Sequence, residues 1–202
     1  MTGKMKLAGA LLTLAIGSGA GAQGVALDAQ APDFTLSDNG GVEHTLSQYR
    51  GSVVVLEWIN FDCPFVKKFY APGVMPKLQK QYREQGVVWL SINSSAPGKQ
   101  GHFAGKDLDK RIKSEKHAAT AYLLDTDGTV GKLYGARTTP HMYLIDDEGV
   151  LRYAGAIDDS PTTDSKDIEG AVNYVVQALG EIAGGDEVSV KTTRPYGCSV
   201  KY

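Results

Sequence analysis

The sequence predicts an α/β fold in which helices cover both faces of a mixed sheet. Two short apolar, β-branched runs, at 53–59 and 87–92, are typical of buried parallel strands, and a helical segment separates them. A strand-turn-strand pattern at 141–157 predicts an antiparallel hairpin, and an amphipathic segment follows at 168–182. Because crossovers between parallel strands lie against the sheet, we expect helices on both of its faces.

The first 22 residues have the pattern of an export signal. Lys4 and Lys6 precede an apolar run from Leu7 to Ile16, and a small-residue stretch ending at Ala22 offers a cleavage site. The apolar run is shorter than the ~20 residues that a spanning helix needs. We therefore expect residues 1–22 to be a cleaved signal peptide and the mature chain, without a membrane span, to be periplasmic or secreted. An uncleaved N-terminal anchor is the alternative.

The rest of the chain has the length and composition of one globular domain with a tail. We expect residues 23–182 to form that domain and residues 183–202 to form the C-terminal tail. The formal net charge of −2 gives no reason to expect nucleic acid or an anionic lipid surface as a partner. Cys63 and Cys198 are the only cysteines. In an exported protein such a pair is expected to form a disulfide unless something keeps it reduced.

The N-terminal half is expected to contain a small hairpin and a kinked helix. Residues 30–49 alternate like two short strands around a turn at 38–41. After Cys63, helix-compatible residues continue to about Arg83. Prolines at positions 72 and 76 should break or kink this helix, because an interior proline removes a hydrogen bond and clashes with the preceding turn.

The C-terminal half continues the alternation of strands and helices. Residues 93–105 are rich in Ser, Gly and Pro and predict a loop, whereas the charged stretch 106–117 predicts a solvated surface helix. A strand at 122–125 and a short helical stretch at 130–134 then lead into the hairpin. The apolar positions of 168–182 predict the closing helix.

One cysteine lies at a position suited to chemistry. Cys63 follows the strand 53–59 and immediately precedes Pro64, which is favoured in the first turn of a helix. Free backbone N–H groups and the helix dipole favour a thiolate at such a site, and Lys67 and Lys68 follow about one turn later. The pattern predicts a nucleophilic cysteine, although lysines on a helix surface are more often simply solvated.

Several motifs, in their order and spacing, resemble one known family. They are Ala31-Pro32-Asp33-Phe34-Thr35-Leu36, Leu46 to Gly51, Trp58 to Cys63, Thr138-Thr139-Pro140, and Met142-Tyr143-Leu144-Ile145-Asp146 with Gly149. Together they resemble the thioredoxin-like redoxins, a group that includes the exported TlpA-type proteins and the peroxiredoxins of the AhpC/TSA type. The resemblance covers about residues 30–180.

The resemblance implies a thioredoxin fold with an N-terminal β-hairpin and a redox site around Cys63. In this family Cys63 would be the nucleophile, Pro140 the cis-proline that faces it, and the backbone of Thr139 the partner of a bound substrate chain. The implied reaction needs no cofactor. Its partners would be an external thiol reductant and either a peroxide or a protein disulfide.

The chain also departs from both branches of the family. Val66 stands where a thioredoxin-type site has its second cysteine, and Leu56 and Asn60 replace the proline and the threonine or serine of a peroxiredoxin. Arg137 lies near the position of a peroxiredoxin arginine. The sequence therefore leaves hydroperoxide reduction and disulfide exchange open.

The tail offers a second thiol. Gly197 loosens the backbone before Cys198, so a flexible tail could bring Cys198 to Cys63 as a resolving cysteine. The alternative is a structural Cys63–Cys198 disulfide that braces a non-catalytic binding module. Such a module would use the cleft near Thr139 and Pro140 to hold a peptide.

Three further residues have two interpretations each. Glu57 is either a proton relay to the cysteine or a buried, paired carboxylate. Asp62 either raises the pKa of the neighbouring thiol or serves in a turn. His141 could be a ligand or a base, but the spacing of the four histidines predicts no metal site.

Overall fold

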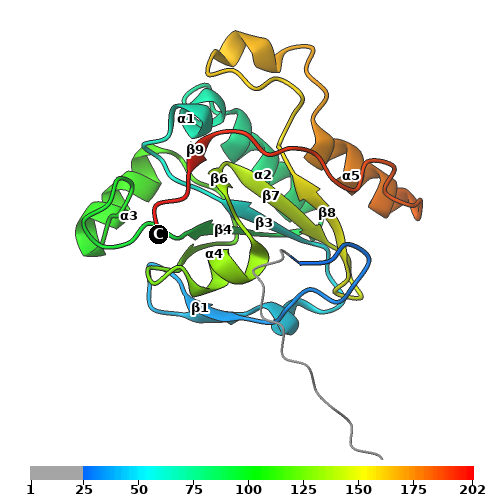
Figure 1. Cartoon of the computed structure of the whole chain (residues 1–202), viewed down its shortest axis with the longest axis horizontal. Helices are drawn as coiled ribbons and strands as arrows, with labels where there is room; N and C mark the ends of the chain where they lie inside the picture. The colour runs from blue at the N-terminus through cyan, green and yellow to red at the C-terminus, as the bar shows by residue number, and fades with distance from the viewer. Residues whose placement is uncertain (1–24) are drawn as a thin grey trace, which may run out of the picture.

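A five-stranded mixed sheet forms the centre of the molecule (Figure 1). The computed structural model describes residues 25–202. The strand order is β5-β4-β3-β7-β8. The strands are β3 (Val54–Trp58), β4 (Val88–Asn93), β5 (Ala121–Leu124), β7 (His141–Ile145) and β8 (Leu151–Gly155). The predicted α/β architecture is therefore confirmed.

Strand β3 is the middle of this sheet, and every residue in it is buried. It pairs in parallel with β4, so that Val54 lies opposite Val88, and antiparallel with β7, so that Trp58 lies opposite His141. The hairpin of β7 and β8 is also antiparallel, as predicted. Burial on both faces explains why the strand is apolar at every position except Glu57, rather than alternating between apolar and polar residues.

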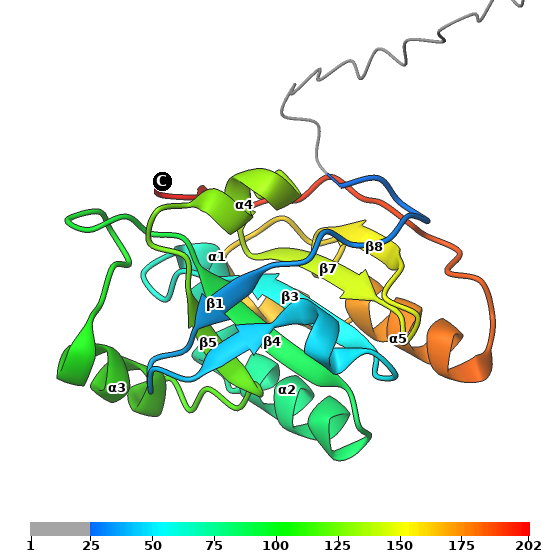
Figure 2. The ribbon, with the colours of Figure 1, turned by 90° about the horizontal axis from the view of Figure 1, so that it is seen from below.

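Helices and a small hairpin cover the two faces. The helices are α1 (Pro64–Tyr70), α2 (Val74–Glu84), α3 (Gly105–Ser114), α4 (Thr129–Tyr134) and α5 (Tyr174–Gly184), with short 3-10 turns η1 (Leu46–Tyr49) and η2 (Ser165–Ile168). One apolar cluster joins Val55 of β3 to α1, α2 and α5. A second cluster joins Leu56 and Trp58 to α4 and to residues near the hairpin of β1 (Thr35–Ser37) and β2 (Glu43–Thr45). In Figures 1 and 2, α4 and β1 lie on the opposite side of the sheet from α2.

Two predicted helices have different boundaries in the structure. The helix after Cys63 is divided near Pro72, as expected, and α2 begins after Gly73, whose φ of 79° is left-handed. The closing helix begins at Tyr174 and not at 168, because the side chain of Asn173 caps it by accepting a 3.0 Å bond from the N–H of Val176. Gly170, whose φ of 86° is left-handed, lies between η2 and α5 and keeps the segment before Tyr174 from being helical.

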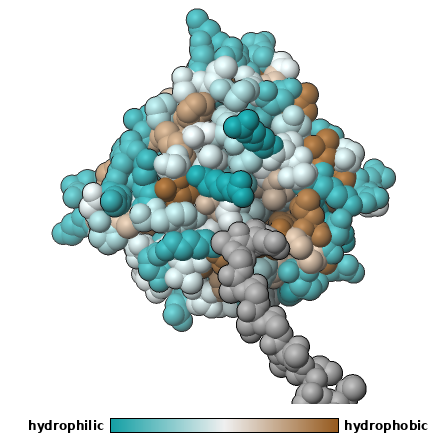
Figure 3. Space-filling view, viewed as in Figure 1, coloured by the Kyte–Doolittle hydropathy of each residue, from teal (hydrophilic) through white to brown (hydrophobic). Residues whose placement is uncertain are grey.

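The C-terminal tail is docked, which corrects the expectation of a flexible segment. Strand β9 (Cys198–Ser199) pairs antiparallel with β6 (Thr138–Thr139), and Figure 1 shows the tail crossing the molecule to reach it. Local sequence could not reveal this pairing, since the two strands have only two residues each and lie far apart in the chain. The face that the tail crosses carries both hydrophilic and hydrophobic residues, and the hydrophobic ones form small separate patches (Figure 3).

The predicted signal peptide, residues 1–22, lies outside the described residues. From Val25 to the end of the chain, no helix has the length and apolar character that a membrane crossing requires.

Glu57 is a buried carboxylate at the centre of β3. It accepts hydrogen bonds from Trp89 Nε1 at 2.8 Å, Gln79 Nε2 at 2.9 Å, Ser91 Oγ at 3.0 Å and Tyr70 Oη at 3.1 Å. These bonds fit the paired-carboxylate interpretation, and they join β3, β4, α1 and α2. Burial, the largest cause, raises the pKa of Glu57 above its ordinary 4.5.

Replacement of Glu57 should therefore have a pH-dependent effect on stability. A folded-state pKa above the unfolded one means that Glu57 contributes stability at low pH and loses it as pH rises through the folded value. From pH 4 to pH 7, we expect the unfolding free energy of Glu57→Gln to improve relative to the wild type. Urea unfolding at several pH values measures this, and a constant difference would contradict it.

The matched variant Glu57→Leu tests the hydrogen bonds. Leucine leaves four buried donors without their acceptor, and one such loss costs about 1–3 kcal/mol. We expect Glu57→Leu to lose at least about 3 kcal/mol at pH 7, well beyond Glu57→Gln, whose amide oxygen keeps an acceptor there. Equal losses in the two variants would show that the bonds contribute little.

Candidate active site

Cys63 stands at the N-cap of α1, after the turn that follows β3. Its backbone is extended, with φ −72° and ψ 125°, and Pro64 occupies the first helical position as predicted. The carbonyl of Cys63 accepts the first helical hydrogen bonds, from Val66 N at 3.0 Å and Lys67 N at 2.9 Å. The residue is fully buried. Cys63 thus lies at the helix end where the dipole places positive partial charge, and solvent does not reach its sulfur.

The strand that faces Cys63 ends in a cis peptide bond. The Thr139–Pro140 bond is cis, and both residues are buried. The thiol of Cys63 donates a 3.0 Å hydrogen bond to the carbonyl oxygen of Thr139. Within residues 25–202, Thr139 Oγ1 is a buried side-chain atom without a hydrogen-bond partner. The structure thus brings together Cys63, Thr139 and Pro140.

Strand β9 places Cys198 beside the same sulfur. Cys198 lies opposite Thr139 in the β6–β9 pair, and its backbone N–H donates to Cys63 Sγ at 3.4 Å. The two sulfur atoms are 2.7 Å apart, and both thiols are free. A disulfide needs ~2.05 Å. An oxidant that removes two electrons, with loss of both thiol protons, could therefore join the two sulfurs with only a small movement.

The environment of Cys198 disfavours its thiolate in the reduced protein. Partial burial, and then the hydrogen bond and charge of Cys63, raise the pKa of Cys198 to about 11. At neutral pH Cys198 therefore carries its proton. The two cysteines are unequal, because one has the helix N-terminus and a donated N–H while the other does not.

Lys68 is not a solvated lysine, contrary to the more common interpretation of its position. Its side chain is fully buried; Nζ lies 3.3 Å from Asp158 and donates to the carbonyl of Ser160 at 2.6 Å. The other oxygen of Asp158 accepts a hydrogen bond from the hydroxyl of Tyr196. Lys67, by contrast, is exposed. The buried lysine thus links α1 to the tail two residues before Cys198.

Asp62 is held away from a role at the thiol by an ion pair. Arg111 of α3 donates to Asp62 Oδ1 at 2.8 Å and to the carbonyl of Phe61 at 2.7 Å. The backbone N–H of Asp62 also bonds to Asn60 Oδ1 at 2.9 Å, which forms a tight turn. Arg111 therefore balances the carboxylate, and the turn interpretation of Asp62 agrees with the geometry.

His141 and Arg137 contribute to the support of the site. His141 is buried, and its Nδ1 lies 3.4 Å from the backbone N of Arg137 and 3.2 Å from Tyr143 Oη. Burial first, and then the charge of Arg137, lower the pKa of His141 to about 4, so it is neutral at pH 7. The side chain of Arg137 is exposed. In the part of the chain that the structure describes, no three acidic, histidine or cysteine residues converge on a metal position.

Sequence reasoning missed the group formed by Lys68, Asp158 and Tyr196. Asp158 follows β8 in an ordinary polar loop, and nothing in its neighbours marks it. The one available signal was the pair Tyr196-Gly197 directly before the tail cysteine. An aromatic residue beside a glycine in an otherwise polar tail is a plausible docking element.

A cysteine at a helix N-terminus, facing a cis-proline beside a mixed sheet, defines the thioredoxin class of fold. Similarity to known proteins in sequence and in structure agrees with this class of fold. Thiol-disulfide oxidoreductase ResA of Geobacillus thermodenitrificans is 32% identical over 130 residues, which cover 63% of this chain and 68% of ResA. An uncharacterized conserved protein of Geobacillus kaustophilus superposes with a TM-score of 0.76 at 27% identity, covering 88% of this chain and 92% of that one.

A further solved structure and a family model complete the comparison. A Chlorobium tepidum protein assigned as the thiol:disulfide interchange protein DsbE gives a TM-score of 0.52 at 25% identity, over 64% of this chain and 84% of that one. Residues 27–154 match the model of the AhpC/TSA family. This chain belongs to the AhpC/TSA family, within the thioredoxin-like redoxins that its motifs resemble.

Replacement of Thr139 by valine tests the unpaired hydroxyl. Because Oγ1 is buried without a partner, Thr139→Val should leave the unfolding free energy unchanged or raise it by about 1 kcal/mol. Denaturant unfolding measures this change. A loss above about 1 kcal/mol would show that the hydroxyl has a partner in solution.

The reactivity of Cys198 should depend steeply on pH. Only the thiolate reacts with iodoacetamide, and a pKa of about 11 means that the thiolate fraction rises about tenfold per pH unit below that value. Mass spectrometry of the reduced protein after timed alkylation, between pH 7 and pH 10, follows Cys198 separately from Cys63. A plateau near pH 8.5 would contradict the raised pKa.

Proposed function

We propose that this chain is an exported thiol-disulfide oxidoreductase that uses Cys63 as its nucleophile and Cys198 as its resolving thiol. The observation that carries the proposal is the 2.7 Å distance between two sulfurs that are 135 residues apart in sequence. The position of one of them at a helix N-terminus supports the assignment of roles. Relatives that are named thiol-disulfide oxidoreductases support the reaction class.

The proposed reaction has two exchange steps. The Cys63 thiolate attacks one sulfur of a protein disulfide; that disulfide breaks, and the released sulfur leaves as a thiolate that takes up a proton. Cys198 then loses its proton and attacks the Cys63 sulfur, which releases the second substrate thiol. The products are a substrate dithiol and a Cys63–Cys198 disulfide. An external thiol reductant returns the two electrons.

The site is built to bias the first step toward Cys63. The N-terminus of α1 and the backbone N–H of Cys198 both place positive partial charge near its sulfur. Cys198 remains protonated at neutral pH, so it does not compete as the first nucleophile. Once Cys63 is in a mixed disulfide, its contribution to the raised pKa of Cys198 disappears. The second thiol then ionises more readily.

The surroundings of Cys63 favour disulfide exchange over hydroperoxide reduction. Asn60 stands where a peroxiredoxin has its threonine or serine, and its side chain is already bonded to Asp62 N and to the carbonyl of Gln100. Arg137, which lies near the expected position of the peroxiredoxin arginine, is exposed. Peroxide consumption by the reduced protein, followed optically, should be slow compared with reduction of a protein disulfide.

The proposal includes a location for the protein, and one non-catalytic alternative stands beside it. The signal peptide predicted for residues 1–22 supports a periplasmic or secreted location, where protein disulfides are abundant. In the alternative, a structural Cys63–Cys198 disulfide would brace a binding module. Structural bridges have reduction potentials below roughly −300 mV, and labile bridges have higher ones. We expect a value above that limit, from redox titration against glutathione.

The most direct test removes one thiol at a time. Cys198→Ser should accumulate a covalent mixed disulfide between Cys63 and a protein substrate such as insulin, because the second step is lost, and turnover should fall at least about a hundredfold. Non-reducing gels and mass spectrometry detect the adduct.

The matched variant Cys63→Ser should form no adduct and show no turnover. Wild-type turnover by Cys198→Ser would exclude Cys198 as the resolving thiol. Wild-type turnover by Cys63→Ser would overturn the proposed function altogether.

A further inference from the structure

The docked tail seals the proposed nucleophile. Cys63 is fully buried, and residues 197–199 of the tail lie across it through the β6–β9 pair. A polypeptide cannot reach a sulfur in this state. Any protein disulfide that exchanges with Cys63 must therefore enter along the path that the tail now occupies.

The tail is anchored on both sides of Cys198. Upstream, Thr193 Oγ1 bonds to Tyr153 Oη at 2.7 Å and accepts from the N–H of Ala156 at 2.9 Å. Downstream, Val200 N donates to the carbonyl of Arg137 at 3.1 Å. The tail thus lies in a continuous groove rather than touching the domain at one point.

The last residue has its own contact. The hydroxyl of Tyr202 donates to the carbonyl of Ala136 at 2.8 Å. Its ring lies where side chains at Gly128 and Gly131 would stand, and the ammonium group of Lys132 is 5.4 Å from the ring centre. Both glycines belong to the α4 region, so the chain end is held on the far side of the site from Thr193.

One position in the groove accepts only glycine. A Cβ atom at Gly197 would collide with the backbone carbonyl of Thr139, and the φ of Gly197 is 137°, which side chains disfavour. A shift of the Thr139 carbonyl to make room would also break the hydrogen bond that it accepts from Cys63. The residue before the incoming cysteine must therefore be glycine.

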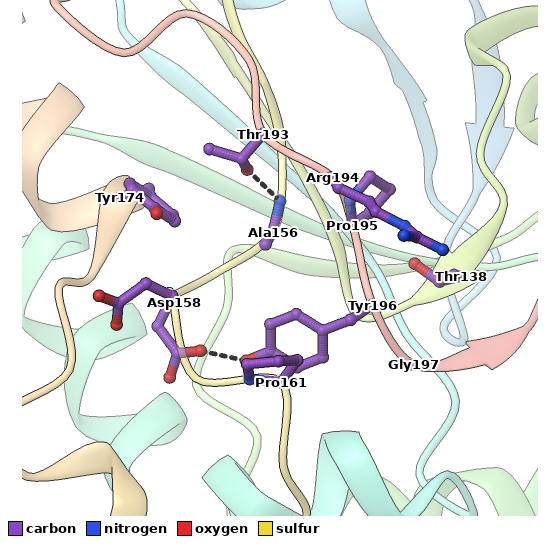
Figure 4. Close-up of a pocket in the computed structure, with 11 residues that line it drawn as sticks. Thr138, Ala156, Asp158, Pro161, Tyr174, Thr193, Arg194, Pro195, Tyr196 and Gly197 are labelled. Carbon is purple, nitrogen blue, oxygen red and sulfur yellow. Dashed lines mark hydrogen bonds between the residues drawn. The ribbon is translucent and has the colours of Figure 1, made fainter.

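The position directly before this glycine favours a tyrosine side chain. Figure 4 shows the side chain of Tyr196 pointing at Asp158, to which its hydroxyl donates a hydrogen bond. The ammonium group of Lys68 balances that buried carboxylate and lies 5.7 Å from the Tyr196 ring. The rings of Phe65 and Tyr196 pack edge to face, with their centres 5.8 Å apart. Without the Tyr196 hydroxyl, the buried carboxylate of Asp158 would lose a hydrogen bond, and this loss weakens binding. A phenylalanine at this position should therefore bind less tightly than a tyrosine.

Open space continues beyond the tyrosine. A cavity of about 620 Å³ lies beside Tyr196, bounded by Asp158, Pro161, Tyr174 and the tail itself (Figure 4). This volume can hold the residues that precede a tyrosine in an incoming chain. The groove is therefore longer than the segment that contacts Cys63.

We propose that the groove under the tail is a recognition site for an extended segment of a partner protein that carries the order Tyr-Gly-Cys, and that the chain's own Tyr196-Gly197-Cys198 occupies it in competition. The inference rests on the proposed function, because it identifies the substrate class of the same site. The tail acts as a tethered copy of the ligand. Its high effective concentration keeps Cys63 covered until a matching segment replaces it.

A binding experiment without redox chemistry tests this proposal. The probe is a fluorescein-labelled peptide with the sequence of residues 193–202 and serine in place of the cysteine, and anisotropy reports its binding to full-length protein. Gly197→Ala should expel the tail without changing the groove. We expect this variant to bind the probe at least about tenfold more tightly than the wild type.

The matched control is Gly180→Ala. Gly180 lies in α5 with open space around it, so its variant should bind like the wild type. Two altered peptides test the selection. One carries alanine at the position of Gly197, and the other carries phenylalanine at the position of Tyr196. Each should bind to the Gly197→Ala protein at least about tenfold more weakly than the unaltered probe. Cys63 alkylation should also accelerate in Gly197→Ala but not in Gly180→Ala.

The outcomes separate this proposal from the proposed function. Equal binding by wild type and Gly197→Ala, equal binding of the three peptides, or no binding at all would overturn the inference, even if Cys63 and Cys198 still exchange disulfides. Should Gly197→Ala not fold, judged by circular dichroism, Tyr202→Ala releases the other end of the tail. It should then tighten probe binding several-fold, and no change would overturn the proposal.

Discussion

The pairing of β6 with β9 is the contact on which the site depends. It places Cys198 opposite Thr139, and it brings a sulfur from the end of the chain to 2.7 Å from Cys63. Each strand has only two residues, so this one short backbone ladder alone could not hold the tail. The contacts of Tyr196 on one side and Tyr202 on the other supply the remaining order.

Buried charge joins the redox site to the rest of the fold. Glu57 connects the central strands to α1 and α2, and Lys68 connects α1 to Asp158 and so to the tail. Removal of one partner from such a buried group is costly, because the polar atoms that remain lose their hydrogen bonds without gaining water. The helix that carries Cys63 is therefore held from both its sheet side and its tail side. This rigidity fixes the direction from which another sulfur can approach.

The same tail both completes the site and closes it. Cys198 is well placed to resolve a mixed disulfide, yet while it is docked Cys63 is fully buried. A thiol that is buried between reactions is protected from oxidants in solution. The cost is that a substrate must displace the tail. Thiol exchange and tail movement are thus one process in the mechanism that we propose.

Much of the fold was predictable from local patterns. Short, mainly apolar and β-branched runs indicated the central strands, and Cys63-Pro64 after such a strand marked a helix N-terminus, because these signals depend on neighbours in sequence. The resemblance added Thr139 and Pro140. Helix boundaries were less predictable: the last helix begins at Tyr174 because Asn173 caps it, although apolar spacing extends back to 168.

Tertiary structure alone decided the side on which the tail docks, the burial of Lys68 and the pairing of Tyr196 with Asp158. These depend on contacts between residues about 40 to 135 positions apart, and periodicity carries no information about such pairs. The sequence by itself determined the kind of fold and the position of the cysteine that we propose as its nucleophile. Whether the second thiol could reach that nucleophile was decided by long-range packing, since two short strands can pair only when the folded domain has brought them side by side.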